Sequence, residues 1–142
     1  MNLRQATAND VPVMFEIRTS VRENHMTLEE LAEDGITLDS VVESLSGPNR
    51  GWLVSCDDRV VGFSLADEEN RVIWAVFVLP EYEGRGGGRL LLNAATEWLL
   101  GSGSGPISLA TAPGTRAETF YLRAGWMPGA VNEEGDVEFT YG

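Results

Sequence analysis

Residues 76–92 read Val-Phe-Val-Leu-Pro-Glu-Tyr-Glu-Gly-Arg-Gly-Gly-Gly-Arg-Leu-Leu-Leu. This order predicts a buried strand, a glycine-rich turn and the start of an amphipathic helix. Glycines let the backbone approach a ligand closely, and the first N–H groups of a helix have no partner within the helix. Together with the positive end of the helix dipole and the side chains of Arg85 and Arg89, these groups predict a binding site for phosphate or pyrophosphate.

The flanking sequence predicts a single mixed α/β domain spanning residues 1–142. Apolar periodicity, capping residues and glycine stops predict helices at about 11–23, after the capping box of Thr27 and Glu30, from near Asp39 to before Gly47, at 91–99 and at about 115–124. Alternation and apolar runs predict strands at 1–6, 52–55, 60–66, 72–78, 107–111 and 137–141. The strand at 72–78 is apolar on both faces, which is typical of a strand in the middle of a sheet.

Charge and composition exclude several classes of function. The 142 residues include 22 acidic and 10 basic residues, for a net charge of -12, which argues against nucleic acid or an anionic membrane as a partner. All ten basic residues are arginines, so chemistry that requires a lysine is excluded. One cysteine and one histidine make a structural zinc site implausible, and we expect no metal. The lone cysteine and the lack of a signal segment or long apolar run predict a cytoplasmic protein.

The spacing of the glycines separates the known types of phosphate-binding turn. A Walker loop requires a lysine, which this chain lacks. A dinucleotide fingerprint requires a glycine at the sixth position from Gly84, and that position is Arg89. Neither type of turn therefore fits.

A third type does fit. Residues 83–88, Glu-Gly-Arg-Gly-Gly-Gly, follow Val-Phe-Val-x-Pro and resemble the acetyl-CoA signature Gln/Arg-x-x-Gly-x-Gly/Ala of the GCN5-related N-acetyltransferase (GNAT) family. Residues 117–126, Ala-Glu-Thr-Phe-Tyr-Leu-Arg-Ala-Gly-Trp, resemble the family segment Ala-x-x-x-Tyr-x-x-x-Gly-Phe. The resemblance implies a GNAT domain, with a mixed, mostly antiparallel sheet whose central strands splay apart between flanking helices. It also implies an acyltransferase that passes the acetyl group of acetyl-CoA directly to a primary amine, and a possible homodimer.

The resemblance also implies roles for individual residues. Main chain at Val76, Phe77 and Val78 would pair with the pantetheine arm of CoA, and an N–H near Phe77 or Val78 would stabilise the oxyanion. The pyrophosphate would be bound by N–H groups of Gly84, Arg85, Gly86, Gly87, Gly88 and Arg89. Tyr121 would protonate the departing thiolate, and its alternative role is that of a core aromatic residue. His25 and Trp74 are candidate acceptor contacts, with a surface histidine and a core tryptophan as the alternatives.

Three positions depart from the family pattern. Glu83 replaces glutamine or arginine, Gly114 replaces a common asparagine, and Val72 stands where some relatives have a glutamate base. These departures keep an alternative open, in which the chain is an acyl-CoA-binding sensor or regulatory module with little activity. A different acyl donor or an alcohol acceptor also remains open. Glu23, Glu68 and Glu69 are candidate bases acting through water, although solvated surface carboxylates are the simpler reading.

The negative charge is concentrated at the two ends of the chain. Residues 1–48 carry a net charge of -6 and residues 127–142 a net charge of -4, whereas residues 49–126 carry only -2. In the resembling family these outer segments border the acceptor side. A negative field there predicts a cationic amine as the acceptor.

Overall fold

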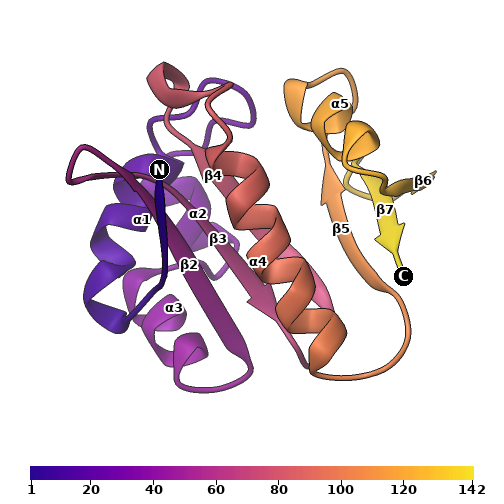
Figure 1. The fold of residues 1–142 in the computed structure, drawn as a ribbon, viewed down its shortest axis with the longest axis horizontal. Coiled ribbons are helices and arrows are strands. Elements are labelled where there is room, and N and C mark those ends of the chain that lie inside the picture. Colours follow the sequence, from indigo (N-terminus) through magenta and orange to yellow (C-terminus); the bar gives the residue numbers. More distant parts are fainter.

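A computed structural model describes all residues from Met1 to Gly142, and its seven strands form one sheet (Figure 1). The order across the sheet is β1-β2-β3-β4-β5-β7-β6, and only β4 and β5 are parallel neighbours. The strands are β1 (Asn2–Gln5), β2 (Asn49–Cys56), β3 (Arg59–Asp67), β4 (Val72–Val78), β5 (Ile107–Thr111), β6 (Met127–Val131) and β7 (Val137–Tyr141). The sheet is mixed and mostly antiparallel, as the resemblance to the GNAT family implies.

Helices cover both faces of this sheet. They are α1 (Val11–Arg18), α2 (Leu28–Glu33), α3 (Leu38–Leu45), α4 (Gly87–Gly101) and α5 (Arg116–Arg123), with short 3-10 turns η1 (Ala8–Asp10) and η2 (Pro80–Tyr82). The Ser64 hydroxyl donates to Leu91 of α4, whereas the flanking Phe63 and Leu65 contact the layer that contains α1. Because successive side chains of a strand point to opposite faces, α4 and α1 lie on opposite sides of the sheet.

The first helix is shorter than predicted. It ends at Arg18, so the predicted extension to about Glu23 is wrong. The hydroxyls of Thr19 and Ser20 donate to the carbonyls of Phe15 and Glu16, which satisfies acceptors of the last turn without further helix. The chain then leaves the helix axis as a loop that leads to α2.

The helices that follow start where local sequence predicts. The hydroxyl of Thr27 accepts from the N–H of Glu30, and the carboxylate of Glu30 accepts from the N–H of Thr27. Thr37 and Ser40 form the same reciprocal pair at the start of α3. Such caps stabilise a short helix by about 1 kcal/mol each. None of the helices combines the length and apolar character needed to cross a bilayer.

The central strand β4 is irregular at one position. Leu65 of β3 pairs with Ala75, and the next residue of β3 pairs with Ile73, so Trp74 is an extra residue that forms a bulge. At a bulge, neighbouring side chains can lie on the same face of the strand, and Trp74 and Ala75 both line one pocket.

Candidate functional site

The site begins where β4 and β5 separate. The two strands share one register pair, Val72 with Ser108, at the start of each strand. Beyond this pair β5 diverges from β4, and the two halves of the molecule stand apart toward the carboxyl ends of these strands (Figure 1). The divergence leaves one edge of β4 without a strand partner.

The register of β3 and β4 determines which main-chain groups face this open edge. The N–H of Leu79 donates to the carbonyl of Val61, and Phe77 pairs with Phe63 two residues along. Hydrogen-bonded pairs alternate along an antiparallel ladder, so Phe77 directs its N–H and C=O toward β3. Val76 and Val78 therefore direct theirs toward the gap. Of the two N–H groups predicted for the oxyanion, that of Phe77 faces β3 and that of Val78 faces the gap.

The glycine-rich turn presents a run of unpaired N–H groups. Within the chain, none of the N–H groups from Gly84 to Arg89 has a hydrogen-bond acceptor, and the first helical bond is that of Leu90 to Gly86. Gly84 and Gly86 have φ values of 76° and 89°, which side chains other than glycine rarely adopt. The turn is thus a nest of donors at the N-terminus of a 15-residue helix, with the chemistry to hold a pyrophosphate.

The cationic side chains of this turn are exposed. Arg85 lies near the ring of Tyr82, with 5.1 Å between the guanidinium carbon and the ring centroid, and Arg89 makes no ion pair. Both remain available to a polyanion in solvent.

Gly87 and Gly88 form the first turn of α4, where other side chains pack closely. A Cβ on Gly88 would lie 3.5 Å from the ring of Phe120.

Helix α5 closes onto the turn from the other side of the gap. In addition to the packing of Phe120, the Nε atom of Arg116 lies 3.3 Å from a carboxylate oxygen of Glu83. The N–H of Arg116 donates to the carboxylate of Glu23 at 2.9 Å. Three segments distant in sequence therefore meet at the N-terminus of α5. The charge of Glu83 at the signature position has a cationic partner, which sequence reasoning missed.

Tyr121 lies on the inner face of α5. Its ring centroid is 5.9 Å from that of Phe139 and 6.4 Å from that of Trp126, and the residue is only 7% exposed. Burial raises the pKa of the Tyr121 phenol far above its ordinary value of 10.0. A phenol in this setting keeps its proton at neutral pH, as a proton donor must.

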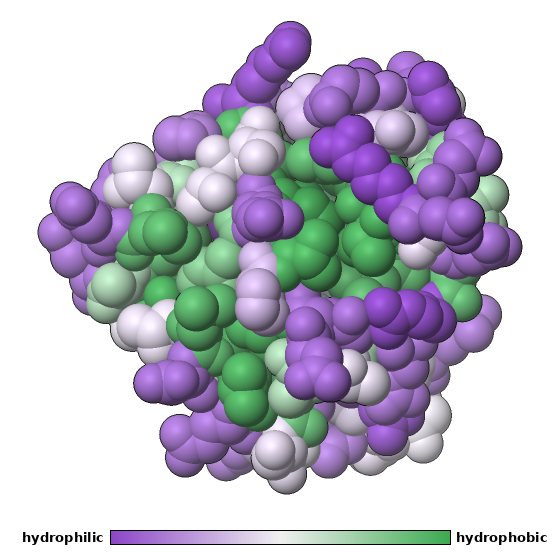
Figure 2. Space-filling view, turned by 90° about the vertical axis from the view of Figure 1, so that its left-hand side faces the viewer, coloured by the Kyte–Doolittle hydropathy of each residue, from purple (hydrophilic) through white to green (hydrophobic).

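A second element of the site is an apolar pocket on the face of the sheet opposite α4. Its volume is about 120 Å³, and eleven of the twelve residues that line it are hydrophobic. They come from α1, α2, α3, β3, β4 and the loops between the three helices, and they include Phe77, the neighbour of Val78. The pocket is therefore next to the open edge of β4, because Phe77 lines the pocket and the adjacent Val78 directs its N–H toward the gap. Figure 2 shows the side of the molecule on which α1 and α3 lie, where apolar side chains form a patch bordered by polar ones.

The one charged residue in the pocket lining is Arg18, the last residue of α1. Its guanidinium carbon lies 4.3 Å from the centroid of the Phe77 ring, and its Nη1 donates to the carbonyl of Asn24 at 2.8 Å. Desolvation lowers the pKa of Arg18, which still remains protonated. Sequence reasoning missed this residue, although its spacing from Val11 and Met14 places it on the buried face of α1.

The two residues predicted as acceptor contacts differ in position. Trp74 lines the apolar pocket, and its indole N–H donates to the side-chain oxygen of Asn49 at 2.6 Å. His25 is exposed in the loop after α1, does not line the pocket, and its Nε2 lies 3.0 Å from the carbonyl oxygen of Thr19. Of the base candidates, Glu23 is bound to the N-terminus of α5, whereas Glu68 and Glu69 are exposed near the turn between β3 and β4.

No group of three or more histidine, cysteine, aspartate or glutamate side chains is arranged to hold a metal ion. The donors that the structure does assemble are main-chain N–H groups, arginines and one buried phenol. This set fits a phosphate-bearing ligand.

The fold has close counterparts among solved structures. The chain matches the PaiA N-acetyltransferase of Thermoplasma acidophilum in complex with coenzyme A with a TM-score of 0.79, at 13% identity over 99% of this chain and 98% of the other. It matches a ribosomal-protein-alanine N-acetyltransferase of Brucella melitensis with a TM-score of 0.73, at 19% identity over 99% and 98%. An acetyltransferase of Thermus thermophilus gives a TM-score of 0.72, at 17% identity over 99% and 97%.

Among curated proteins, none is a significant match to the sequence. The family model described as "Acetyltransferase (GNAT) family" matches residues 14–126. This range includes both motifs, β4, α2, α3 and the part of α1 from Met14 to Arg18. The chain therefore belongs to the acetyltransferase (GNAT) family.

Proposed function

We propose that this protein transfers the acetyl group of acetyl-CoA to the primary amine of a small acceptor. The observation that carries the proposal is the row of unpaired N–H groups from Gly84 to Arg89 beside the open edge of β4. The first feature suits the pyrophosphate of CoA, and the second suits the amide-containing pantetheine arm. The chain belongs to the acetyltransferase (GNAT) family, and the thioester of acetyl-CoA would supply the acetyl group.

The pantetheine arm would pair with the main chain of Val76 and Val78, whose polar groups face the gap. The thioester carbonyl would then receive a hydrogen bond from the N–H of Val78 as negative charge develops on its oxygen. The acceptor nitrogen attacks the carbonyl carbon, the carbon–sulfur bond breaks, and the sulfur takes the proton of the Tyr121 hydroxyl. The amine releases its proton to solvent water, and the Tyr121 phenolate regains a proton from water before the next turnover. The enzyme itself forms no covalent bond.

The surface around the pocket supports an amine as the acceptor. Residues 28–45, which supply Leu31, Ile36 and Val41 to the pocket lining, carry six acidic side chains and no basic one. All six acidic residues are exposed. An ammonium group approaching the pocket meets a negative field, which raises its local concentration.

A release assay for the CoA thiol, run over a broad panel of amines, tests this function. We expect thiol release that depends on both acetyl-CoA and the amine. The alternative, a sensor that binds acyl-CoA without turnover, would give CoA binding with no release on any amine of the panel. The ion pair of Glu83 with Arg116 removes one argument for the sensor, because the acidic side chain near the pyrophosphate site is balanced.

A further inference from the structure

The apolar pocket contains a cation that the proposed chemistry leaves unused. Arg18 is the one charged residue among twelve that line the pocket. The chain has 22 acidic residues, and Arg4, Arg59 and Arg116 are all paired with carboxylates, yet no carboxylate lies within ion-pair distance of Arg18. A partly desolvated cation without an anion is costly, so its position calls for an explanation.

The geometry holds one part of this guanidinium and leaves the rest available. Nη1 of Arg18 donates to the carbonyl of Asn24, and the guanidinium carbon lies over the ring of Phe77. Nε and Nη2 have no acceptor within the chain. Two parallel donors on an arginine match the two oxygens of a carboxylate. The Phe77 ring and the carbonyl of Asn24 thus hold the guanidinium of Arg18 in one orientation.

The location of this fork relates it to the reacting centre. Phe77 is adjacent to Val78, whose N–H faces the gap between β4 and β5, and its ring contributes to the pocket wall. The remaining walls are aliphatic and aromatic, and an apolar cavity of about 150 Å³ holds a molecule the size of benzene. A volume of about 120 Å³ therefore suits a branched aliphatic side chain.

We propose that Arg18 binds a carboxylate of the acceptor, and that the acceptor is a free α-amino acid with an apolar side chain. The inference rests on the proposed function and deepens it. In such a molecule the amine, the carboxylate and the side chain share one carbon atom. Binding the carboxylate at Arg18 and the side chain in the pocket leaves the amine directed along β4 toward Val78.

Leucine and leucinamide form the matched pair of acceptors for the test. They differ only in that leucinamide has an amide in place of the carboxylate. Leucinamide therefore has a net positive charge, and the acidic surface by itself favours it over leucine. We expect the wild-type protein to prefer leucine in kcat/KM by at least about tenfold, because removing the carboxylate leaves the half-buried guanidinium of Arg18 without its partner. Arg18→Gln should abolish this preference through a loss on leucine alone. Arg18→Lys should retain part of it.

Arg22→Gln is the matched control, because Arg22 is an exposed arginine on the same segment. It should leave the ratio unchanged. An equal loss on both acceptors in Arg18→Gln would mean that Arg18 only supports the loop, and would overturn the proposal. A wild-type preference for leucinamide would overturn it as well.

Binding measurements separate this inference from the proposed function. N-acetylleucine and N-acetylleucinamide are titrated against the protein, and binding is followed by NMR or by tryptophan fluorescence, to which Trp74 in the pocket contributes. Selective binding of N-acetylleucine that Arg18→Gln removes would support the carboxylate site even if no amine is acetylated. Turnover of amines without any selectivity for a carboxylate would leave the transferase in place and refute the role of Arg18.

Discussion

Glu83 and Arg116 form an ion pair between the glycine-rich turn and the first residue of α5, with 3.3 Å between Nε and the carboxylate oxygen. Both side chains are substantially exposed, so the pair adds little to the free energy of unfolding. Its effect should be electrostatic and local. Arg116 balances a negative charge beside the turn that we propose binds the pyrophosphate of acetyl-CoA.

We expect Arg116→Gln to raise the KM for acetyl-CoA by roughly threefold to tenfold, because Glu83 is then unbalanced near a polyanion. Glu83→Gln alone should leave this KM unchanged or lower it. The double variant should return to within about twofold of the wild-type protein, since the repulsive charge and its partner are both gone. Arg123→Gln, on the exposed end of the same helix, serves as the control. A double variant as weak as Arg116→Gln would show that Glu83 is not the cause.

Tyr121→Phe tests the proposed proton donor. The substitution keeps the ring that packs on Trp126 and Phe139, so the melting temperature should change little. The kcat should fall by at least about tenfold with little change in CoA binding, as for a group that acts only in the transition state. Tyr141→Phe, at the more exposed C-terminal tyrosine, should have no such effect. An unchanged kcat in Tyr121→Phe would exclude the role.

The raised pKa of Tyr121 has its own consequence for the pH dependence of the reaction. An ordinary tyrosine loses its proton near pH 10.0, and burial moves the pKa of Tyr121 well above that value. The wild-type kcat should therefore not decline through loss of the phenolic proton as the pH passes about 10. A kcat that falls with an apparent pKa near 10 and becomes pH-independent in Tyr121→Phe would contradict the raised pKa of Tyr121, while supporting its role as proton donor.

Gly62 lies where β3, β4 and α4 approach closely. A Cβ at this position would lie 2.9 Å from the carbonyl oxygen of Phe77 and 3.0 to 3.1 Å from side chains of Val54 and Leu91. Gly62→Ala should lower the free energy of unfolding by about 1–3 kcal/mol, because the backbone of β4 cannot yield easily. It should also reduce kcat by displacing Val78. Gly101→Ala is the control, since nothing lies within 4 Å of its Cβ, and it should be neutral or slightly stabilising.

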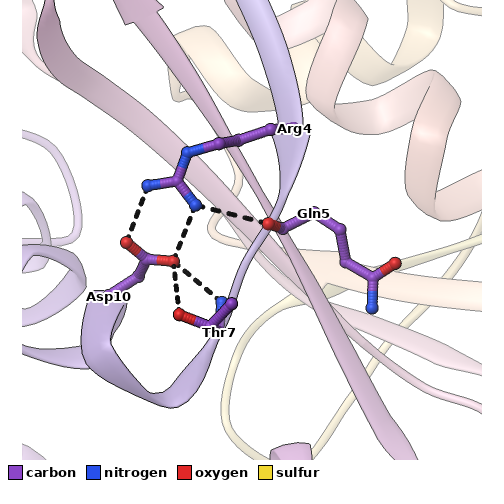
Figure 3. Close-up of polar contacts among 4 residues, drawn as sticks. All are labelled: Arg4, Gln5, Thr7 and Asp10. Carbon is purple, nitrogen blue, oxygen red and sulfur yellow. Dashed lines mark hydrogen bonds and ion pairs between the residues drawn. The ribbon is translucent and has the colours of Figure 1, made fainter.

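An ion pair in the N-terminal segment lowers the pKa of Asp10. Arg4 donates two hydrogen bonds to Asp10, at 2.8 and 2.9 Å, and Asp10 also accepts from the N–H and hydroxyl of Thr7 (Figure 3). The hydrogen bonds from Arg4 are the main cause that lowers the pKa of Asp10 from 3.8 to about 2. The carboxylate is thus favoured in the folded state. Its stabilisation is complete above about pH 4 and is lost as the pH falls toward 2.

We expect Asp10→Asn to lower the free energy of unfolding at neutral pH by about 1 kcal/mol, the value being limited by the exposure of Arg4. Denaturant unfolding of the two proteins at about pH 6 and about pH 2.5 measures the difference. The two stabilities should converge at the lower pH. Arg4→Gln should reproduce the loss at neutral pH, and a difference that persists unchanged in acid would refute the ionic origin.

Local rules account for most of what could be predicted from the amino-acid sequence. The strand, glycine-rich turn and helix from β4 to α4 depend on neighbouring residues, as do the capping box at Thr27 and the stop of α5 at Gly125. The family motifs lie in these same segments, so family and fold followed from them. The first helix was predicted too long, because the hydroxyls of Thr19 and Ser20 ended it where apolar periodicity continued.

The sequence by itself determined the glycine-rich turn, the helices and every strand except β6 (Met127–Val131), because these depend on residues a few positions apart. Only the tertiary structure decided that the main-chain N–H and C=O groups of Val76 and Val78, rather than those of Phe77, face the gap. The register of β3 and β4 sets this alternation. Only the tertiary structure placed Arg18 among apolar side chains without an anion, and brought Arg116 to Glu83. Such contacts join residues distant along the chain and depend on packing that no local pattern encodes.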